Sequence, residues 1–175
     1  MPCTLLKSCA LFALSALALL AWTQARANCG ALVQVGTCTV SVSATALAFG
    51  DYNPALGTTR DMTSTITVNA TVTGLLVLTR VAYTISLGAG VTGSMADRRM
   101  TGGSAGQSLK YNLFTDASHS SNWGTNGVSN SMSAIAILGG VDLTATHTVY
   151  GRIPIHQYVS AGTNYTDTIT VTVNY

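Results

Sequence analysis

The 175-residue sequence predicts an all-β antiparallel sandwich. Short alternating runs rich in Val, Ile, Thr and Tyr are separated by clusters of Gly, Asn, Asp and Ser, a pattern typical of that fold. After residue 28, no segment combines an apolar 3.6-residue period with helix-capping signals, and Gly interrupts every longer stretch. We therefore expect about seven strands and almost no helix.

The first 27 residues predict a secretory signal peptide. Lys7 precedes an apolar run that ends at Trp22, and the small residues Ala25 and Ala27 occupy the positions that a signal peptidase reads. The run is shorter than the roughly 20 apolar residues that a transmembrane helix needs. We expect cleavage after Ala27, which leaves residues 28–175 as one exported domain with no stable membrane span.

The composition of residues 28–175 restricts the classes of partner. Removing Lys7 and Arg26 from the eight basic residues of the chain leaves six, which the six Asp residues balance. A net charge near zero offers no basic surface for nucleic acid or for an anionic membrane. Solubility must rest on Thr, Ser, Asn and Gly, which suits strands with hydroxyl-rich outer faces.

Two cysteines remain after the predicted cleavage. Cys3 and Cys9 leave with the signal peptide, and Cys29 and Cys38 enter an oxidising compartment, where a disulfide between them is expected. The alternative is a pair of free or metal-binding thiols. That alternative lacks the clustered His residues of a zinc site.

Alternation of apolar and hydroxyl-bearing residues locates the strands. In residues 65–72 the even positions are apolar and the odd positions are Thr or Asn; in the last strand Ile169, Val171, Val173 and Tyr175 alternate with polar residues. Residues 88–106 and 116–130 are the two longest predicted loops. The predicted strands are residues 39–48, 65–72, 81–87, 109–113, 132–138, 146–155 and 168–175.

One predicted loop contains the residue types of a Ser-His-Asp site. His119 lies near Asp116, Ser118 and Ser120. A triad also needs an oxyanion hole around a strained nucleophile turn, and no G-x-S-x-G surrounds Ser118 or Ser120, the serines beside His119. Because polar clusters are usual in turns, we expect no catalytic residues and a protein that is not an enzyme.

No metal or cofactor is predicted either. His147 and His156 lie near the two ends of one predicted strand, which at the usual rise per residue places them about 30 Å apart, too far to share a metal. The Gly-rich residues 101–106 lack the Lys and the following helix of a phosphate-binding loop.

Motif segments spread over almost all of residues 28–175 carry a family resemblance. They are residues 38–42, 49–54, 66–68, 99–100, 109–116, 123–124, 150–153 and 161–175. In this order, the sequence resembles the spore coat protein U domain family, which includes the subunits of archaic chaperone-usher pili. The matching residues to which the resemblance gives a structural role are Phe49, Gly50, Tyr52, Tyr111, Gly151, Gly162 and Tyr165.

The resemblance implies an immunoglobulin-like sandwich that lacks one strand. A periplasmic chaperone would fill the apolar groove first, and a neighbouring pilus subunit would replace it at an outer-membrane usher. By this analogy Ile169, Val171, Val173 and Tyr175 border the groove, although the same alternation also fits ordinary core residues. The expected location is the periplasm in transit and then a cell-surface fibre that serves adhesion or biofilm formation.

This sequence departs from the family pattern at two places. Members commonly pair the Cys at the Cys38 position with a Cys that ends the second strand, where this chain has Ala70; Cys29 is then the expected partner. A polymerising subunit usually carries about ten alternating residues to donate, whereas residues 28–37 contain only a short run, 31–35, which a Cys29–Cys38 bridge would tie in a loop. We therefore expect a subunit that accepts a strand but donates poorly, as a tip or terminal subunit would.

A second function fits the same sequence. A self-contained exported binding domain, for instance for carbohydrate, would have strands that close without help from a partner. A spore-coat protein would use the mechanics of the fibre subunit on a different surface. A fibre subunit and a self-contained binding domain differ in one property, which is whether the edge of the last strand is open.

Overall fold

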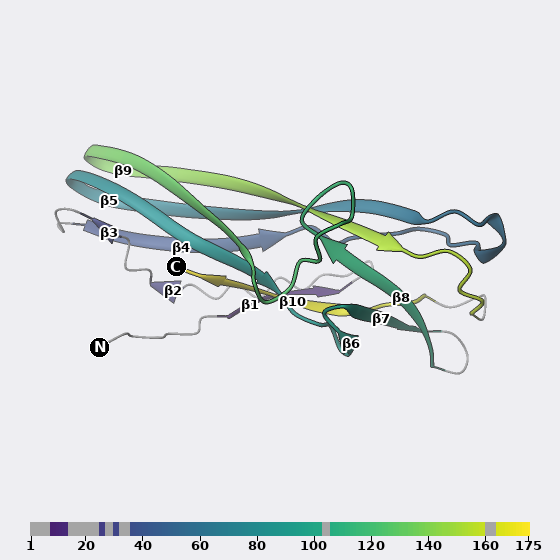
Figure 1. Cartoon of the computed structure of the whole chain (residues 1–175). Coiled ribbons are helices and arrows are strands. Elements are labelled where there is room, and N and C mark those ends of the chain that lie inside the picture. The colour runs from purple at the N-terminus through teal and green to yellow at the C-terminus, as the bar shows by residue number, and fades with distance from the viewer. Residues whose placement is uncertain (1–7, 14–24, 27–29, 32–35, 103–105, 160–163) are drawn as a thin grey trace.

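The computed structural model describes residues 8–13, 25–26, 30–31, 36–102, 106–159 and 164–175. It confirms the predicted all-β antiparallel fold (Figure 1). A single 3-10 turn, η1 (Pro54–Leu56), is the helical element of these ranges. The strands are β1 (Ser8–Ala13), β2 (Ala25–Arg26), β3 (Gly30–Ala31), β4 (Gly36–Ala44), β5 (Arg60–Leu87), β6 (Thr92–Ser94), β7 (Asp97–Gly102), β8 (Gln107–Phe114), β9 (Val128–Ile153) and β10 (Thr168–Asn174).

Two very long strands, β5 and β9, form the centre of the fold. They pair antiparallel without a change of register, from Arg60 opposite Ile153 to Ile85 opposite Val128. In Figure 1 the two ribbons turn over together at one end of the molecule, so each strand contributes to both layers. The expectation of separate strands at 65–72 and 81–87, and at 132–138 and 146–155, was therefore wrong, because each pair belongs to one continuous strand.

A pair of glycines marks the region between the two halves of this ribbon. Gly74 lies opposite Gly139, and Gly139 has a φ of 112°, which residues with a side chain rarely adopt. Across this region the buried positions of β5 change from even to odd numbers. They are even-numbered up to Val72 and odd-numbered from Thr79 onward. The ribbon can therefore bend and keep an apolar face inward on both sides of the bend.

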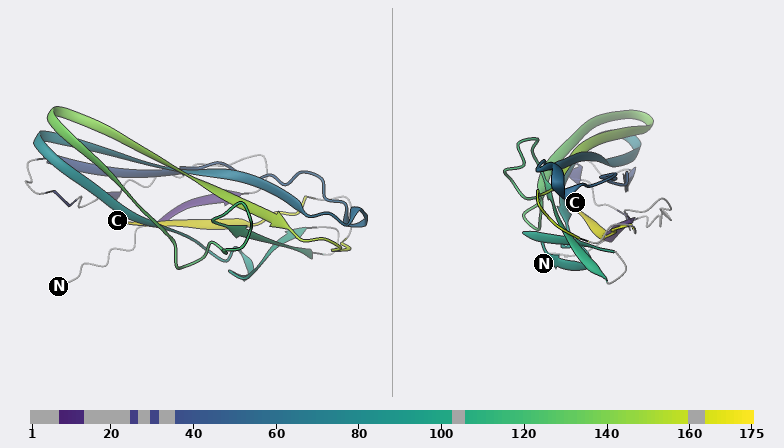
Figure 2. Two further views of the ribbon diagram at one scale, coloured as in Figure 1. Left: turned by 45° about the horizontal axis from the view of Figure 1, so that its top comes forward. Right: turned by 90° about the vertical axis from the view of Figure 1, so that its right-hand side faces the viewer.

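The two layers share the halves of β5 and β9 (Figure 2). One layer holds β4, the first half of β5, the second half of β9 and β8; the other holds the second half of β5, the first half of β9 and β10. A hydrogen bond of 2.9 Å between Tyr83 and His147 joins the layers. The buried apolar residues that fill the space between them include Val40, Phe49, Ile66, Val68, Ile85, Leu87, Tyr111, Leu113, Trp123, Val149, Ile153, Ile169 and Val171.

Residues 88–106, expected as a loop, contain the strands β6 and β7. β7 pairs with β8, and its Thr101 also exchanges two backbone hydrogen bonds with Thr166, just before β10. The expectation failed because six Gly residues interrupt this segment and its strands are short. The two hydrogen bonds of Thr101 join the β8–β7 side of the fold to the β10 layer.

A completely buried arginine, Arg98, holds this junction together. A guanidinium has five N–H groups, and each of these five donates a hydrogen bond here. Burial lowers the pKa of Arg98, and the nearby Tyr111 and Asp167 oppose that shift. The acceptors, at 2.6–3.3 Å, are the backbone oxygens of Leu87, Gly88, Met95 and Trp123 and the side-chain oxygen of Asn112.

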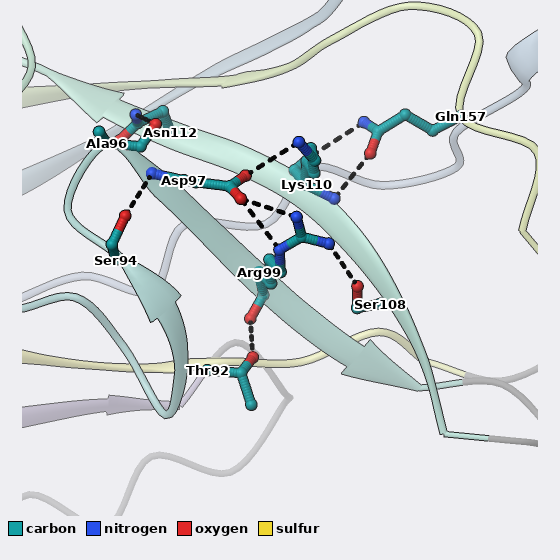
Figure 3. A network of polar contacts seen from close by, with 9 residues as sticks. All are labelled: Thr92, Ser94, Ala96, Asp97, Arg99, Ser108, Lys110, Asn112 and Gln157. Atoms are coloured by element: carbon teal, nitrogen blue, oxygen red, sulfur yellow. Dashed lines mark hydrogen bonds and ion pairs between the residues drawn. The ribbon is translucent and has the colours of Figure 1, made fainter.

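The next residue, Arg99, lies on the other face of β7 in a surface network (Figure 3). Its guanidinium contacts Asp97 at 2.7 Å, and Lys110 approaches the same carboxylate at 3.3 Å. The Gln157 side chain bonds both backbone groups of Lys110, as a neighbouring strand would. Since these charges are solvated, the network adds little to stability.

We predict that Arg98→Lys destabilises the full chain by about 3 kcal/mol or more, because a lysine has only three donors and leaves buried backbone oxygens without partners. The matched substitution Arg99→Lys, one residue away, should cost less than about 1 kcal/mol. Urea denaturation followed by circular dichroism measures both. Equal losses for the two variants would contradict a central role for Arg98.

Candidate functional site at the edge of strand β10

The last strand has the burial pattern that its sequence predicts, up to its final residue. Ile169, Val171 and Val173 are 4%, 2% and 5% exposed, and the Thr residues between them lie on the outer face. Tyr175 differs, because it is 37% exposed beyond the end of the strand. Partial burial still raises the pKa of its hydroxyl.

The inner edge of β10 pairs with the end of β5. Val171 lies opposite Leu87, and Gly88 donates a backbone hydrogen bond of 2.9 Å to Thr170. The backbone polar groups of Thr170 therefore face β5. Because these groups alternate along an antiparallel strand, those of Ile169 and Val171 face the outer edge.

The outer edge of β10 pairs with β1, a segment of the predicted signal peptide. The register places Phe12 opposite Ile169 and Ala10 opposite Val171, and the two strands run antiparallel. β1 also contacts β4. The position between the last strand and β4 is thus filled by residues that lie outside the predicted mature domain.

A buried carboxylate, Asp167, fixes the start of β10. The Tyr111 hydroxyl donates to it at 2.6 Å, and the backbone N–H groups of Val91 and Thr168 donate to its other oxygen. Burial and this carboxylate raise the pKa of Tyr111, so its hydroxyl keeps its proton. A side chain at Gly90 would collide with Asp167, since its Cβ would lie 2.0 Å from the carboxylate oxygen.

A small apolar cavity of about 20 Å³ lies between the layers and reaches β10. The space is too small to hold more than about one water molecule and has an almost wholly apolar lining, so it is expected to be dry. The core next to Ile169 is therefore incompletely filled. The lining residues are Leu47, Ser64, Ile66, Leu87, Tyr111, Leu113, Val149 and Ile169.

The structure brings three of the family-motif residues together behind this cavity. The Phe49 ring meets the Tyr111 ring edge to face, with centroids 6.0 Å apart. Gly151 lies against the Phe49 ring, and a Cβ at position 151 would be 2.9 Å from Phe49 and 2.4 Å from Leu47. Position 151 therefore has no room for a side chain.

The other motif residues lie in connecting segments. Gly50 has a φ of 68°, and Tyr52 donates a hydrogen bond of 2.8 Å to Pro154. Tyr165 is half-buried beside β8, and Gly162 lies outside the described residues. Tyr52 therefore joins its segment to the residue that follows β9.

Cys38 lies in β4, opposite Val72, and is half-buried. It is disulfide-bonded, but the structure does not describe its partner, and Cys29 is outside the described residues. The pairing of Cys29 with Cys38 stays a prediction.

The residues that suggested a triad form a turn instead. The carboxylate of Asp116 accepts hydrogen bonds from the Ser118 and Ser120 hydroxyls and from the backbone of Ser120 and Ser121. These bonds lower the pKa of Asp116. The His119 ring does not join them, because it packs against Phe114.

Among the described residues, the two remaining histidines have aromatic neighbours. His147 bonds Tyr83, and burial lowers the pKa of its imidazole, while His156 stacks on Tyr158. The described part of the chain has no group of three or more His, Cys, Asp or Glu side chains that could hold a metal. Within the same residues, no helix has the length and apolar character to cross a membrane.

Sequence reasoning missed Arg98 as the residue that organises this end of the fold. Arg98 and Arg99 are adjacent and chemically identical, and only the pleat of β7 decides which one is buried. Alternation with Met100, which is buried, would have placed Arg98 on the inner face. Trp123 was noted only as part of a motif, although its indole N–H donates to Ile85 and its backbone oxygen accepts from Arg98.

These observations define an all-β sandwich domain with a strand-pairing site at the edge of its last strand. The chain belongs to the Spore Coat Protein U domain family, whose model matches residues 23–172. A search of curated proteins found no match.

One of the solved structures that match this chain is similar at low identity. It is the CsuC–CsuE chaperone–tip adhesion subunit pre-assembly complex from archaic chaperone-usher Csu pili of Acinetobacter baumannii. The similarity covers 77% of this chain at 18% identity, with a TM-score of 0.39. This chain spans 40% of the length of the solved chain.

We predict that Gly151→Ala destabilises the full chain by about 1–3 kcal/mol, because the new methyl group would overlap Leu47 and Phe49. Gly140→Ala is the matched control, since its Cβ would come no nearer than 3.3 Å to the Thr73 methyl group. Chemical denaturation measures both. A loss for Gly151→Ala no larger than for Gly140→Ala would show that the motif glycine is not needed for packing.

Proposed function

We propose that residues 28–175 form an exported subunit of a surface fibre, assembled by the chaperone-usher pathway through donor-strand complementation. The observation that carries this proposal is the pairing of the outer edge of β10 with β1. β1 lies in the predicted signal peptide, so cleavage after Ala27 would leave that edge without a partner strand. A strand from another protein can then take its place.

The physical basis is the combination of an open edge with an apolar row. The backbone groups of Ile169 and Val171 offer hydrogen bonds to an added strand, and such bonds give affinity in β-augmentation. The side chains of Ile169, Val171 and Val173 form a buried apolar row beside that edge, and full burial of each is worth about 1.5–3 kcal/mol. An empty edge of this kind promotes aggregation, so a chaperone must cover it.

The open edge of β10 must be covered at each stage of export, and this sets the order of its partners. A periplasmic chaperone covers the edge after export, and at the outer-membrane usher a neighbouring subunit replaces it. Membership of the Spore Coat Protein U domain family and the near-neutral charge of residues 28–175 are consistent with a structural role at the cell surface. In this role the protein is not an enzyme and contributes to adhesion or biofilm formation.

The amino-terminal end of the mature domain favours a tip or terminal position. Cys38 is disulfide-bonded, and Cys29 is its expected partner. A bridge between these residues would tie residues 29–38 into a loop that cannot extend into a neighbour. The subunit would then accept a strand without donating one.

We predict that residues 28–175, expressed in a bacterial periplasm, are recovered in soluble form only with a cognate chaperone. Val171→Pro should cut recovery of the chaperone complex about tenfold or more, because the lost N–H faces the added strand. Val171→Ile keeps the N–H and is the control. Co-purification measures complex formation; a stable monomer without any chaperone would favour a self-contained binding domain.

We also predict that the purified subunit does not form long homopolymers. Electron microscopy of the protein released from its chaperone tests this expectation, and mass spectrometry of non-reduced peptides tests the Cys29–Cys38 bridge. Long fibres of this subunit alone would exclude a terminal position.

A further inference from the structure

The predicted signal peptide contributes strands to both borders of the candidate site. β1 pairs with the outer edge of β10, and β2 pairs with β4, where Ala25 lies opposite Val40. β10 and β4 are the two strands between which β1 lies. Cleavage after Ala27 would therefore remove the cover of both borders in one step.

The geometry of β1 is that of an added strand. It runs antiparallel to β10, and five of its residues have register partners from Thr168 to Thr172. Residues 8–13 carry no charge. Because Ile169 and Val171 direct their backbone groups outward, the residues opposite them, Phe12 and Ala10, provide the matching backbone groups.

We propose that the uncleaved signal peptide occupies the strand-accepting edge of its own domain and closes it until cleavage. This inference rests on the proposed function, since it assigns a regulator to the same edge. The occupant is the segment Ser8–Ala13, and the strands that it excludes are those of the chaperone and of neighbouring subunits.

Tethering explains why an internal strand excludes a partner. A segment that belongs to the same chain as its binding site acts at an effective concentration that can reach the order of millimolar. A separate chaperone must compete with that concentration. Cleavage removes the tether, so the signal segment can leave and the edge becomes available where the chaperone is present.

The test compares two double variants of the full chain, refolded under oxidising conditions. Ala10→Pro with Phe12→Pro removes the N–H groups that face β10, whereas Leu11→Pro with Ala13→Pro removes N–H groups that face away from it. The probe is a fluorescent synthetic peptide of residues 7–14. Residue-resolved hydrogen exchange at Ile169 and Val171 reports the outer edge, and Thr172 reports the inner one.

The wild-type chain and the Leu11/Ala13 variant should protect Ile169 and Val171 at least tenfold more than the Ala10/Phe12 variant, with Thr172 unchanged. Only the Ala10/Phe12 variant, or wild-type chain cleaved by signal peptidase, should take up the peptide. Equal exchange and equal uptake in all forms would overturn the inference and leave the proposed function standing. A cleaved chain that stays a soluble monomer and takes up no peptide would overturn both.

Discussion

The buried guanidinium of Arg98 is the interaction on which the rest of the structure depends. It gathers backbone oxygens from the end of β5, the β6–β7 turn and the Trp123 segment into one set of charge-assisted hydrogen bonds. Such bonds are stronger than neutral ones, and a buried acceptor that loses its donor is costly. The buried charge of Arg98 is therefore tolerated because all five of its donors are used.

Arg98 also connects the core to the candidate site. Two of its acceptors, the oxygens of Leu87 and Gly88, belong to the segment that pairs with the inner edge of β10. Asp167 holds the start of the same strand through Tyr111. β10 is thus fixed on its inner side by strong contacts, which leaves its outer edge as the side where a strand can be exchanged.

The alternation of β10 and the absence of long helices could be read from the sequence, because side-chain direction in a strand follows a two-residue period. The continuity of β5 from Arg60 to Leu87 could not be read from the sequence. Residues between 72 and 81 include Gly74 and an apolar run, and a local pattern does not distinguish a loop between two strands from a bend within one. The pairing of Gly74 with Gly139, 65 positions along the chain, decides this point.

The sequence by itself determined the fold class, the apolar face of the last strand and the family motifs, since each of these depends on residues close together in the chain. Only the tertiary structure decided which five acceptors the guanidinium of Arg98 meets, that Asp167 meets Tyr111, and that a segment of the predicted signal peptide lies at the edge of β10. These features depend on contacts between distant segments, and the free energy of such contacts is set by burial and by hydrogen-bond partners that no local pattern specifies.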